Sequence, residues 1–103
     1  MYVAVTYFHV RAGLISQAME ARETLVEALA QRRQGFLSCE LLVSPYDPSY
    51  FIEITRWLSS DAYWQSWEDP VAWPLYKRLE LLLEEDLTPI PHDQVAVCQA
   101  QLD

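Results

Sequence analysis

The chain has 103 residues, which is typical of one domain, and 51% of them are hydrophobic, which excludes a disordered tail. Its formal net charge is −8 and its seven Lys and Arg residues form no basic patch, so phosphate-driven binding of nucleic acid is excluded. No apolar run is long enough to span a membrane, and no signal peptide opens the chain. We therefore expect a single cytoplasmic domain, residues 1–103, without membrane or nucleic-acid partners.

The N-terminal third predicts a strand followed by a long helix. Residues 2–10, YVAVTYFHV, are rich in aromatic and β-branched side chains and indicate a strand. Residues 14–33 carry apolar side chains at helical spacing, with charged side chains on the other side. Gly35 is well placed to end this helix, because glycine tolerates a positive φ.

A hairpin is predicted in the middle of the chain. Residues 36–44 and 50–57 have strand composition. Between them lies SPYDPS, residues 44–49, which supplies two prolines, an aspartate and two serines. This turn chemistry predicts that the two strands pair with each other.

The last part of the chain predicts a split helical region and a fourth strand. Ser59 or Ser60 is expected to cap a short helix that ends near Trp67. A second helix is expected from Pro70, with Asp69 as its cap, to about residue 85. Residues 88–91 are expected to form an extended connector, and residues 93–100 a final strand.

The order β-α-β-β-α-β indicates an α+β, ferredoxin-like fold with a four-stranded antiparallel sheet. Helices on one face of such a sheet leave the other face to be covered. Ile52 and Ile54 should lie on that second face, where a monomer would expose an apolar patch. We therefore expect a homodimer in which a second copy of the chain covers the sheet.

The predicted strand at residues 50–57 has an unusual second face. Strand side chains alternate between faces, so Glu53, Thr55 and Trp57 share one side with Phe51. A carboxylate, a hydroxyl and an indole in a row suggest either contact with water or the lining of a cleft beneath the helices.

These segments also resemble a known family. The run GFLSCELLVSPYDPSYFIEITRW, then SSDAYWQSW and the apolar helix LYKRLELLLEE, is similar to the antibiotic biosynthesis monooxygenase domain family. The likeness covers nearly the whole chain. It implies a dimeric α+β barrel in which each subunit keeps a cleft between its sheet and its helices.

One activity that the resemblance implies is oxygenation of polycyclic phenols to quinones without a cofactor. Trp57 and Tyr63 match the spacing of a tryptophan and a tyrosine in those proteins, and Lys77 or Arg78 matches a basic residue of the last helix. The quinone-forming members carry an asparagine where this chain has Glu53. An amide can donate a hydrogen bond, whereas an ionised carboxylate only accepts one.

Another implied activity is heme binding or heme degradation. Those members use a histidine of the last helix as the iron ligand, and at that position this chain has Tyr76. Tyrosine can ligate ferric heme, so Tyr76 or His9 is the candidate ligand under this alternative. A non-catalytic dimer that binds a hydrophobic small molecule is a third alternative, because one fold hosts many functions.

The favoured hypothesis is a cofactor-independent monooxygenase that acts on a flat aromatic phenol or quinol. Its catalytic candidates are Glu53 as a general base and Trp57 and Tyr63 as residues that hold the ring. The candidates for substrate binding are Thr55, Trp73, Tyr76, Lys77 and Arg78. The structural alternatives are a Glu53 paired with Arg22 or Arg78, and aromatic residues that only fill the core.

The cysteines and histidines suggest no further chemistry. Cys39 and Cys98 form no CxxC motif and are expected to be reduced, with pairing across a dimer as the alternative. His9 and His92 lie far apart in the sequence and have no third ligand at metal-binding spacing, so we expect no metal site.

Overall fold

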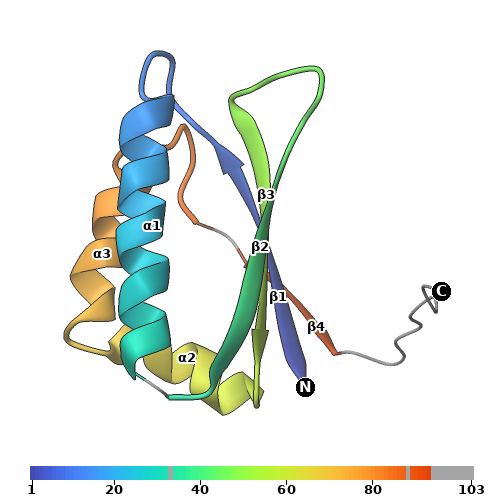
Figure 1. The fold of residues 1–103 in the computed structure, drawn as a ribbon, viewed down its shortest axis with the longest axis vertical. Helices are drawn as coiled ribbons and strands as arrows, with labels where there is room; N and C mark the ends of the chain where they lie inside the picture. The colour runs from blue at the N-terminus through green and yellow to red at the C-terminus, as the bar shows by residue number, and fades with distance from the viewer. Residues whose placement is uncertain (33, 88, 94–103) are drawn as a thin grey trace, which may run out of the picture.

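The computed structural model describes residues 1–32, 34–87 and 89–93. It has two layers, with the helices packed on one face of a sheet (Figure 1). The elements are β1 (Tyr2–His9), α1 (Ile15–Arg32), β2 (Phe36–Val43), β3 (Tyr50–Trp57), α2 (Ser60–Glu68), α3 (Ala72–Glu80) and β4 (Pro89–Asp93). This order confirms the α+β, ferredoxin-like fold expected from the sequence.

The sheet is antiparallel and has the strand order β2-β3-β1-β4. The central strand β3 therefore pairs with β2 on one side and with β1 on the other. Glu53 of β3 lies opposite Thr6 of β1 and Leu41 of β2. This register places Glu53 near the middle of the sheet, on the face that the helices cover.

Helix α1 buries a stripe of small and branched side chains at helical spacing: Ala18, Ala21, Leu25 and Leu29. The turn after it contains Gly35, which has a φ of +94° and lies close to α2. The sequence-based prediction that Gly35 takes a positive φ is confirmed. Arg33, the last residue of the predicted helix, lies outside the described residues.

Helix α3 is shorter than predicted at both ends. The Asp69 carboxylate accepts hydrogen bonds from the backbone N–H groups of Val71 and Ala72, as a capping residue does. The helix ends at Glu80 rather than near residue 85. The reason is tertiary: the chain turns so that Leu83 bridges to Val10, and long-range backbone hydrogen bonds replace those of another helical turn.

The last strand begins earlier than predicted. Strand β4 spans Pro89–Asp93. The sequence predicted an extended connector at residues 88–91 and a strand from residue 93, so Asp93 is the one residue of β4 that lies in the predicted strand. Two prolines are tolerated here because β4 lies at the edge of the sheet and, among the described residues, pairs with β1 alone. Residues 94–100 of the predicted strand, including Cys98, lie outside the described residues.

The outer face of the sheet carries apolar side chains, as the alternation predicts. Ile52 and Ile54 are half-buried, while Tyr7, Leu42 and Tyr50 are exposed. A hollow of about 520 Å³ lies on this face beside the β2–β3 turn, lined by Tyr7, Leu42, Val43, Ser44, Pro45, Tyr46, Tyr50, Phe51 and Ile52. Among the described residues, no helix combines the length and apolar character that crossing a bilayer requires.

Candidate functional site on the inner face of the sheet

Strand β3 directs its odd-numbered side chains toward the helices, as predicted. Phe51, Glu53 and Trp57 are buried, and Thr55 is half-buried. On the opposite face of β3, Tyr50 is exposed and Ile52 is half-buried. The row of carboxylate, hydroxyl and indole is therefore on the helix-covered face, and not on the surface that meets water.

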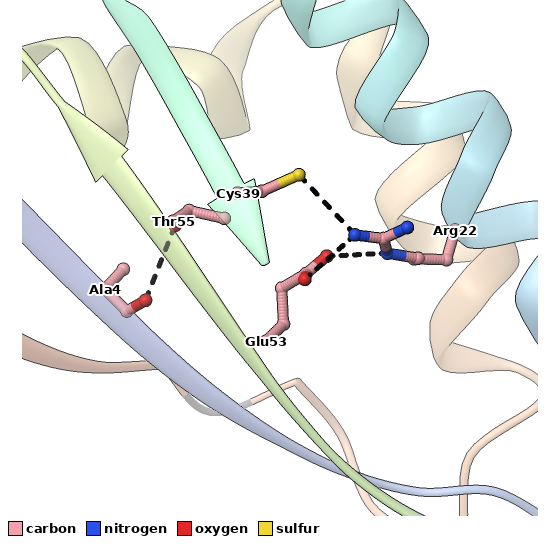
Figure 2. A network of polar contacts seen from close by, with 5 residues as sticks. All are labelled: Ala4, Arg22, Cys39, Glu53 and Thr55. Atoms are coloured by element: carbon pink, nitrogen blue, oxygen red, sulfur yellow. Dashed lines mark hydrogen bonds and ion pairs between the residues drawn. The ribbon is translucent and has the colours of Figure 1, made fainter. Parts of the chain in front are cut away.

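Glu53 forms a bidentate ion pair with Arg22 of α1 (Figure 2). The Nε of Arg22 donates to Oε1 of Glu53 at 2.8 Å, and Nη2 donates to Oε2 at 3.1 Å. Nη2 also donates to Sγ of Cys39 on β2 at 3.5 Å. One guanidinium group thus joins α1 to two strands. Of the two arginines that the sequence offered as partners for Glu53, Arg22 and Arg78, the structure pairs Glu53 with Arg22.

The ion pair lies largely away from solvent. The side chain of Glu53 is 6% exposed and that of Arg22 is 16% exposed. Burial raises the pKa of Glu53 above its ordinary value, although the hydrogen bonds and charge of Arg22 oppose this. The hydrogen bond with Glu53 in turn raises the pKa of Arg22. Burial also raises the pKa of the Cys39 thiol, so this cysteine is not an activated nucleophile.

Trp57 and Tyr63 lie together at one end of the same face. The rings meet edge to face with centroids 5.4 Å apart, and both residues are buried. The indole N–H of Trp57 donates to the Thr55 hydroxyl at 3.0 Å, and the Thr55 hydroxyl lies 3.5 Å from the backbone carbonyl of Ala4. Three of the predicted site residues, Thr55, Trp57 and Tyr63, are therefore in one contact network.

Tyr76 lies on the buried side of α3 and is bonded within the helical layer. Its hydroxyl and that of Ser66 are 2.8 Å apart, in a hydrogen bond that either oxygen can donate. The ring stacks on Trp67 with centroids 3.9 Å apart and an interplanar angle of 11°. Burial raises the pKa of Tyr76 to about 12, so its phenol is neutral at physiological pH.

The remaining predicted residues lie on the exposed side of α3. Lys77, Arg78 and Trp73 are exposed, and the Lys77 ammonium group sits over the Trp73 ring at 4.5 Å. Lys77 also pairs with Glu80 at 3.2 Å. The structure does not bring either basic residue of α3 to Glu53. The cation beside Glu53 is Arg22, which sequence reasoning considered only as a structural partner.

Neither Tyr76 nor His9, the two candidates for ligating heme iron, is in a suitable environment for that role. Tyr76 is neutral, hydrogen-bonded and stacked under Trp67. His9 stacks on Tyr50 with centroids 4.0 Å apart, on the outer face of the sheet. The two candidates therefore lie on different sides of the sheet. Within residues 1–32, 34–87 and 89–93, no group of three His, Cys, Asp or Glu side chains could hold a metal ion.

The sheet order and this inner-face arrangement define a ferredoxin-like subunit whose polar centre lies between sheet and helices. A family model for antibiotic biosynthesis monooxygenases matches residues 1–73, which include β1, α1, the hairpin and α2. The chain belongs to the antibiotic biosynthesis monooxygenase family. A comparison with curated proteins returned no match.

Two solved structures are similar to this chain in fold. An antibiotic biosynthesis monooxygenase assigned in Nitrosomonas europaea is 17% identical, with a TM-score of 0.81 over 93% of this chain and 100% of that chain. SnoaB, a cofactor-independent oxygenase from Streptomyces nogalater, is 19% identical, with a TM-score of 0.81 over 93% of this chain and 94% of that chain. At these identities the likeness establishes the fold alone.

Proposed function

We propose that this protein is a monooxygenase that acts on a flat aromatic phenol or quinol without a bound metal or flavin. The observation that carries the proposal is the buried Arg22–Glu53 ion pair beneath α1, on the same sheet face as Trp57. A carboxylate held in that environment can accept a proton, and a guanidinium group beside it can stabilise the resulting anion. SnoaB, which shares the fold, is described as a cofactor-independent oxygenase.

In the proposed reaction, Glu53 takes the phenolic proton of the substrate. The carboxylate then becomes neutral, and the negative charge moves to the substrate oxygen. Arg22 then no longer faces a charged Glu53, so its N–H groups stabilise the phenolate. In this proposal the cation at the reacting oxygen is therefore Arg22, and not Lys77 or Arg78, which are exposed on α3.

The electron-rich phenolate then reduces dioxygen. One oxygen atom bonds to the ring carbon opposite the phenolic oxygen and becomes the second carbonyl of a quinone. The other oxygen atom leaves as water with the phenolic proton and the proton lost from that ring carbon. Phenol and dioxygen thus give quinone and water, and the substrate supplies all the electrons that dioxygen takes up.

The aromatic residues of the inner face have a positioning role in this proposal. Trp57 and Tyr63 are buried against each other, so in this proposal a substrate ring takes the place of part of this packing and lies against them. Thr55 holds the Trp57 indole in place by its hydrogen bond. Trp73 and Tyr76 extend the aromatic surface through the helical layer.

The homodimer is part of the proposal. Members of the family are typically dimeric. The outer face of this sheet offers exposed Tyr7, Leu42 and Tyr50 around a hollow. A second copy of the chain that covers this surface would remove an apolar patch from water.

Oxygen uptake with a panel of polycyclic phenols tests the proposal. Glu53→Gln should abolish uptake, because an amide cannot take the phenolic proton. The matched control is Glu40→Gln, which removes the carboxylate of an exposed ion pair with Arg56 on the outer face, and it should leave uptake unchanged. Uptake should also fall at acid pH, through a pKa above the ordinary 4.5 of a glutamate.

The proposal would be contradicted if phenols bind to the protein and no oxygen is taken up with any of them. Binding is measured as a rise in the thermal unfolding midpoint, since a ligand stabilises the folded state by mass action. That result would favour a non-catalytic protein that binds a hydrophobic small molecule.

A further inference from the structure

A series of indole and phenol rings runs from the inner face of the sheet to the surface of the helical layer. It starts at Trp57, which is 1% exposed, and continues through Tyr63, which is 4% exposed. It reaches the surface at Trp64, which is 52% exposed, and at Trp73, which is 44% exposed. The series thus connects a buried ring to two that meet solvent.

Successive rings in this series are in contact. Tyr63 has its ring centroid 5.4 Å from that of Trp57, 5.0 Å from that of Trp64 and 6.5 Å from that of Trp67. Trp67 stacks on Tyr76 at 3.9 Å and meets Trp73 edge to face at 6.4 Å. These separations are within the range of packed aromatic pairs, so no non-aromatic residue has to be crossed.

The polar atoms of the series can move the proton that accompanies electron loss from a phenol. The indole nitrogen of Trp67 is buried and forms no hydrogen bond of good geometry. Burial raises the pKa of the Tyr63 phenol, so this residue keeps a hydroxyl proton that it can lose together with an electron. The Tyr76 hydroxyl similarly has the Ser66 oxygen as a partner.

We propose that these six aromatic residues, Trp57, Tyr63, Trp64, Trp67, Trp73 and Tyr76, form a relay that carries oxidising equivalents between the buried site and the protein surface. Indole and phenol are readily oxidised by one electron, and each transfer moves an electron from one ring to an oxidised neighbour. The inference rests on the proposed function only for its source of oxidant, a substrate-derived oxygen radical that escapes productive turnover.

The chemistry of each step balances. An oxidant takes one electron from an exposed indole, and the indole radical cation releases its N–H proton to water. When Tyr63 gives an electron and its hydroxyl proton to the neutral radical of Trp67, the indole is restored and a tyrosyl radical remains. The same exchange can occur between Trp67 and Tyr76.

Pulse radiolysis in the absence of any substrate tests the relay, so its result is independent of oxygenase activity. Azide radicals oxidise indoles and become azide anions. The wild-type protein should show decay of the tryptophanyl absorption with matching growth of the tyrosyl absorption, at a rate that does not depend on protein concentration. The double variant Tyr63→Phe/Tyr76→Phe keeps both rings but lacks both hydroxyls, and this growth should be lost.

Tyr46→Phe is the matched control, because Tyr46 is 96% exposed and lies in the turn between β2 and β3. It should leave the first-order growth unchanged. Both variants are first checked for an unchanged far-ultraviolet circular dichroism spectrum. If the double variant fails this check, the single variants Tyr63→Phe and Tyr76→Phe are measured in its place. Growth that scales with protein concentration, or that persists without the Tyr63 and Tyr76 hydroxyls, would overturn the proposal.

Discussion

The guanidinium group of Arg22 and the carboxylate of Glu53 meet through two hydrogen bonds, of 2.8 and 3.1 Å, between the middle of α1 and the middle of β3. This pair fixes the position of the helix over the sheet at a point that solvent barely reaches. The ion pair should therefore affect both the free energy of unfolding and the proposed oxygenase activity, and the two effects can be measured separately.

Removal of one partner should destabilise the fold strongly. Arg22→Met leaves the Glu53 carboxylate buried without its cation, and we expect the free energy of unfolding to fall by ~3–5 kcal/mol. The measurement is equilibrium urea unfolding. Arg56→Met, which breaks the exposed pair with Glu40, should cost no more than ~1 kcal/mol. Equal losses in the two variants would mean that Glu53 is well solvated without Arg22.

The two glycines of the chain should differ in their tolerance of alanine. Both have a positive φ, of +78° at Gly13 and +94° at Gly35, which costs an alanine about 1–2 kcal/mol. At Gly35 an added Cβ would also lie 2.6 Å from the Cβ of Ala62, whereas at Gly13 nothing lies within 4 Å. Thermal unfolding should therefore show a larger loss for Gly35→Ala than for Gly13→Ala. The reverse order would contradict the close approach of β2 and α2.

Asp69 should make stability depend on pH in the acid range. Hydrogen bonds from the Ala72 and Val71 backbone and from Arg32 lower its pKa below the ordinary 3.8. The unfolded chain then binds a proton more readily than the folded one, so this stabilisation is complete above pH 3.8 and is lost as the pH falls through the lower, folded value. The difference in unfolding free energy between the wild type and Asp69→Asn should shrink as the pH is lowered. A difference that does not vary with pH would contradict this role.

A charge on the outer face of the sheet should separate the proposed dimer. Leu42 is 47% exposed beside the hollow on that face, so Leu42→Lys would place an ammonium group in the covered surface. Light scattering after gel filtration should show a dimer for the wild type and a monomer for this variant. The control is Leu81→Lys, which alters an exposed leucine at the end of α3 and should remain dimeric. A monomeric wild type would refute the dimer.

The fold was predictable because local patterns and tertiary structure agree over most of the chain. The alternation in residues 50–57 predicted which face of β3 is buried, and the SPYDPS turn predicted its pairing with β2. The end of α3 was not predictable, because its apolar spacing continues past Glu80. The helix stops where the backbone of Leu82 and Glu84 forms hydrogen bonds with Arg11 and His9, which are distant in the sequence. The start of β4 was not predicted because it contains prolines, which are found in strands mainly at the edge of a sheet. That β4 lies at an edge is known only from the structure.

The candidate site was predicted only in part. The positions of Glu53, Thr55 and Trp57 follow from a two-residue period, whereas Tyr63 was a candidate only because its spacing from Trp57 resembles that in the family. Which cation meets Glu53 depends on how α1 crosses the sheet, and no local pattern encodes that angle. An arginine on the otherwise apolar stripe of α1 was the available signal for Arg22, because a buried cation needs a carboxylate partner.

The fate of isotopically labelled dioxygen during turnover of a polycyclic phenol tests most directly whether Glu53 and Arg22 form the reaction centre. We predict that the quinone made by the wild type carries one labelled oxygen atom, that Glu40→Gln gives the same product, and that Glu53→Gln gives none. Unlabelled quinone, or labelled quinone formed equally well by Glu53→Gln, would show that the ion pair between α1 and β3 is not the reaction centre.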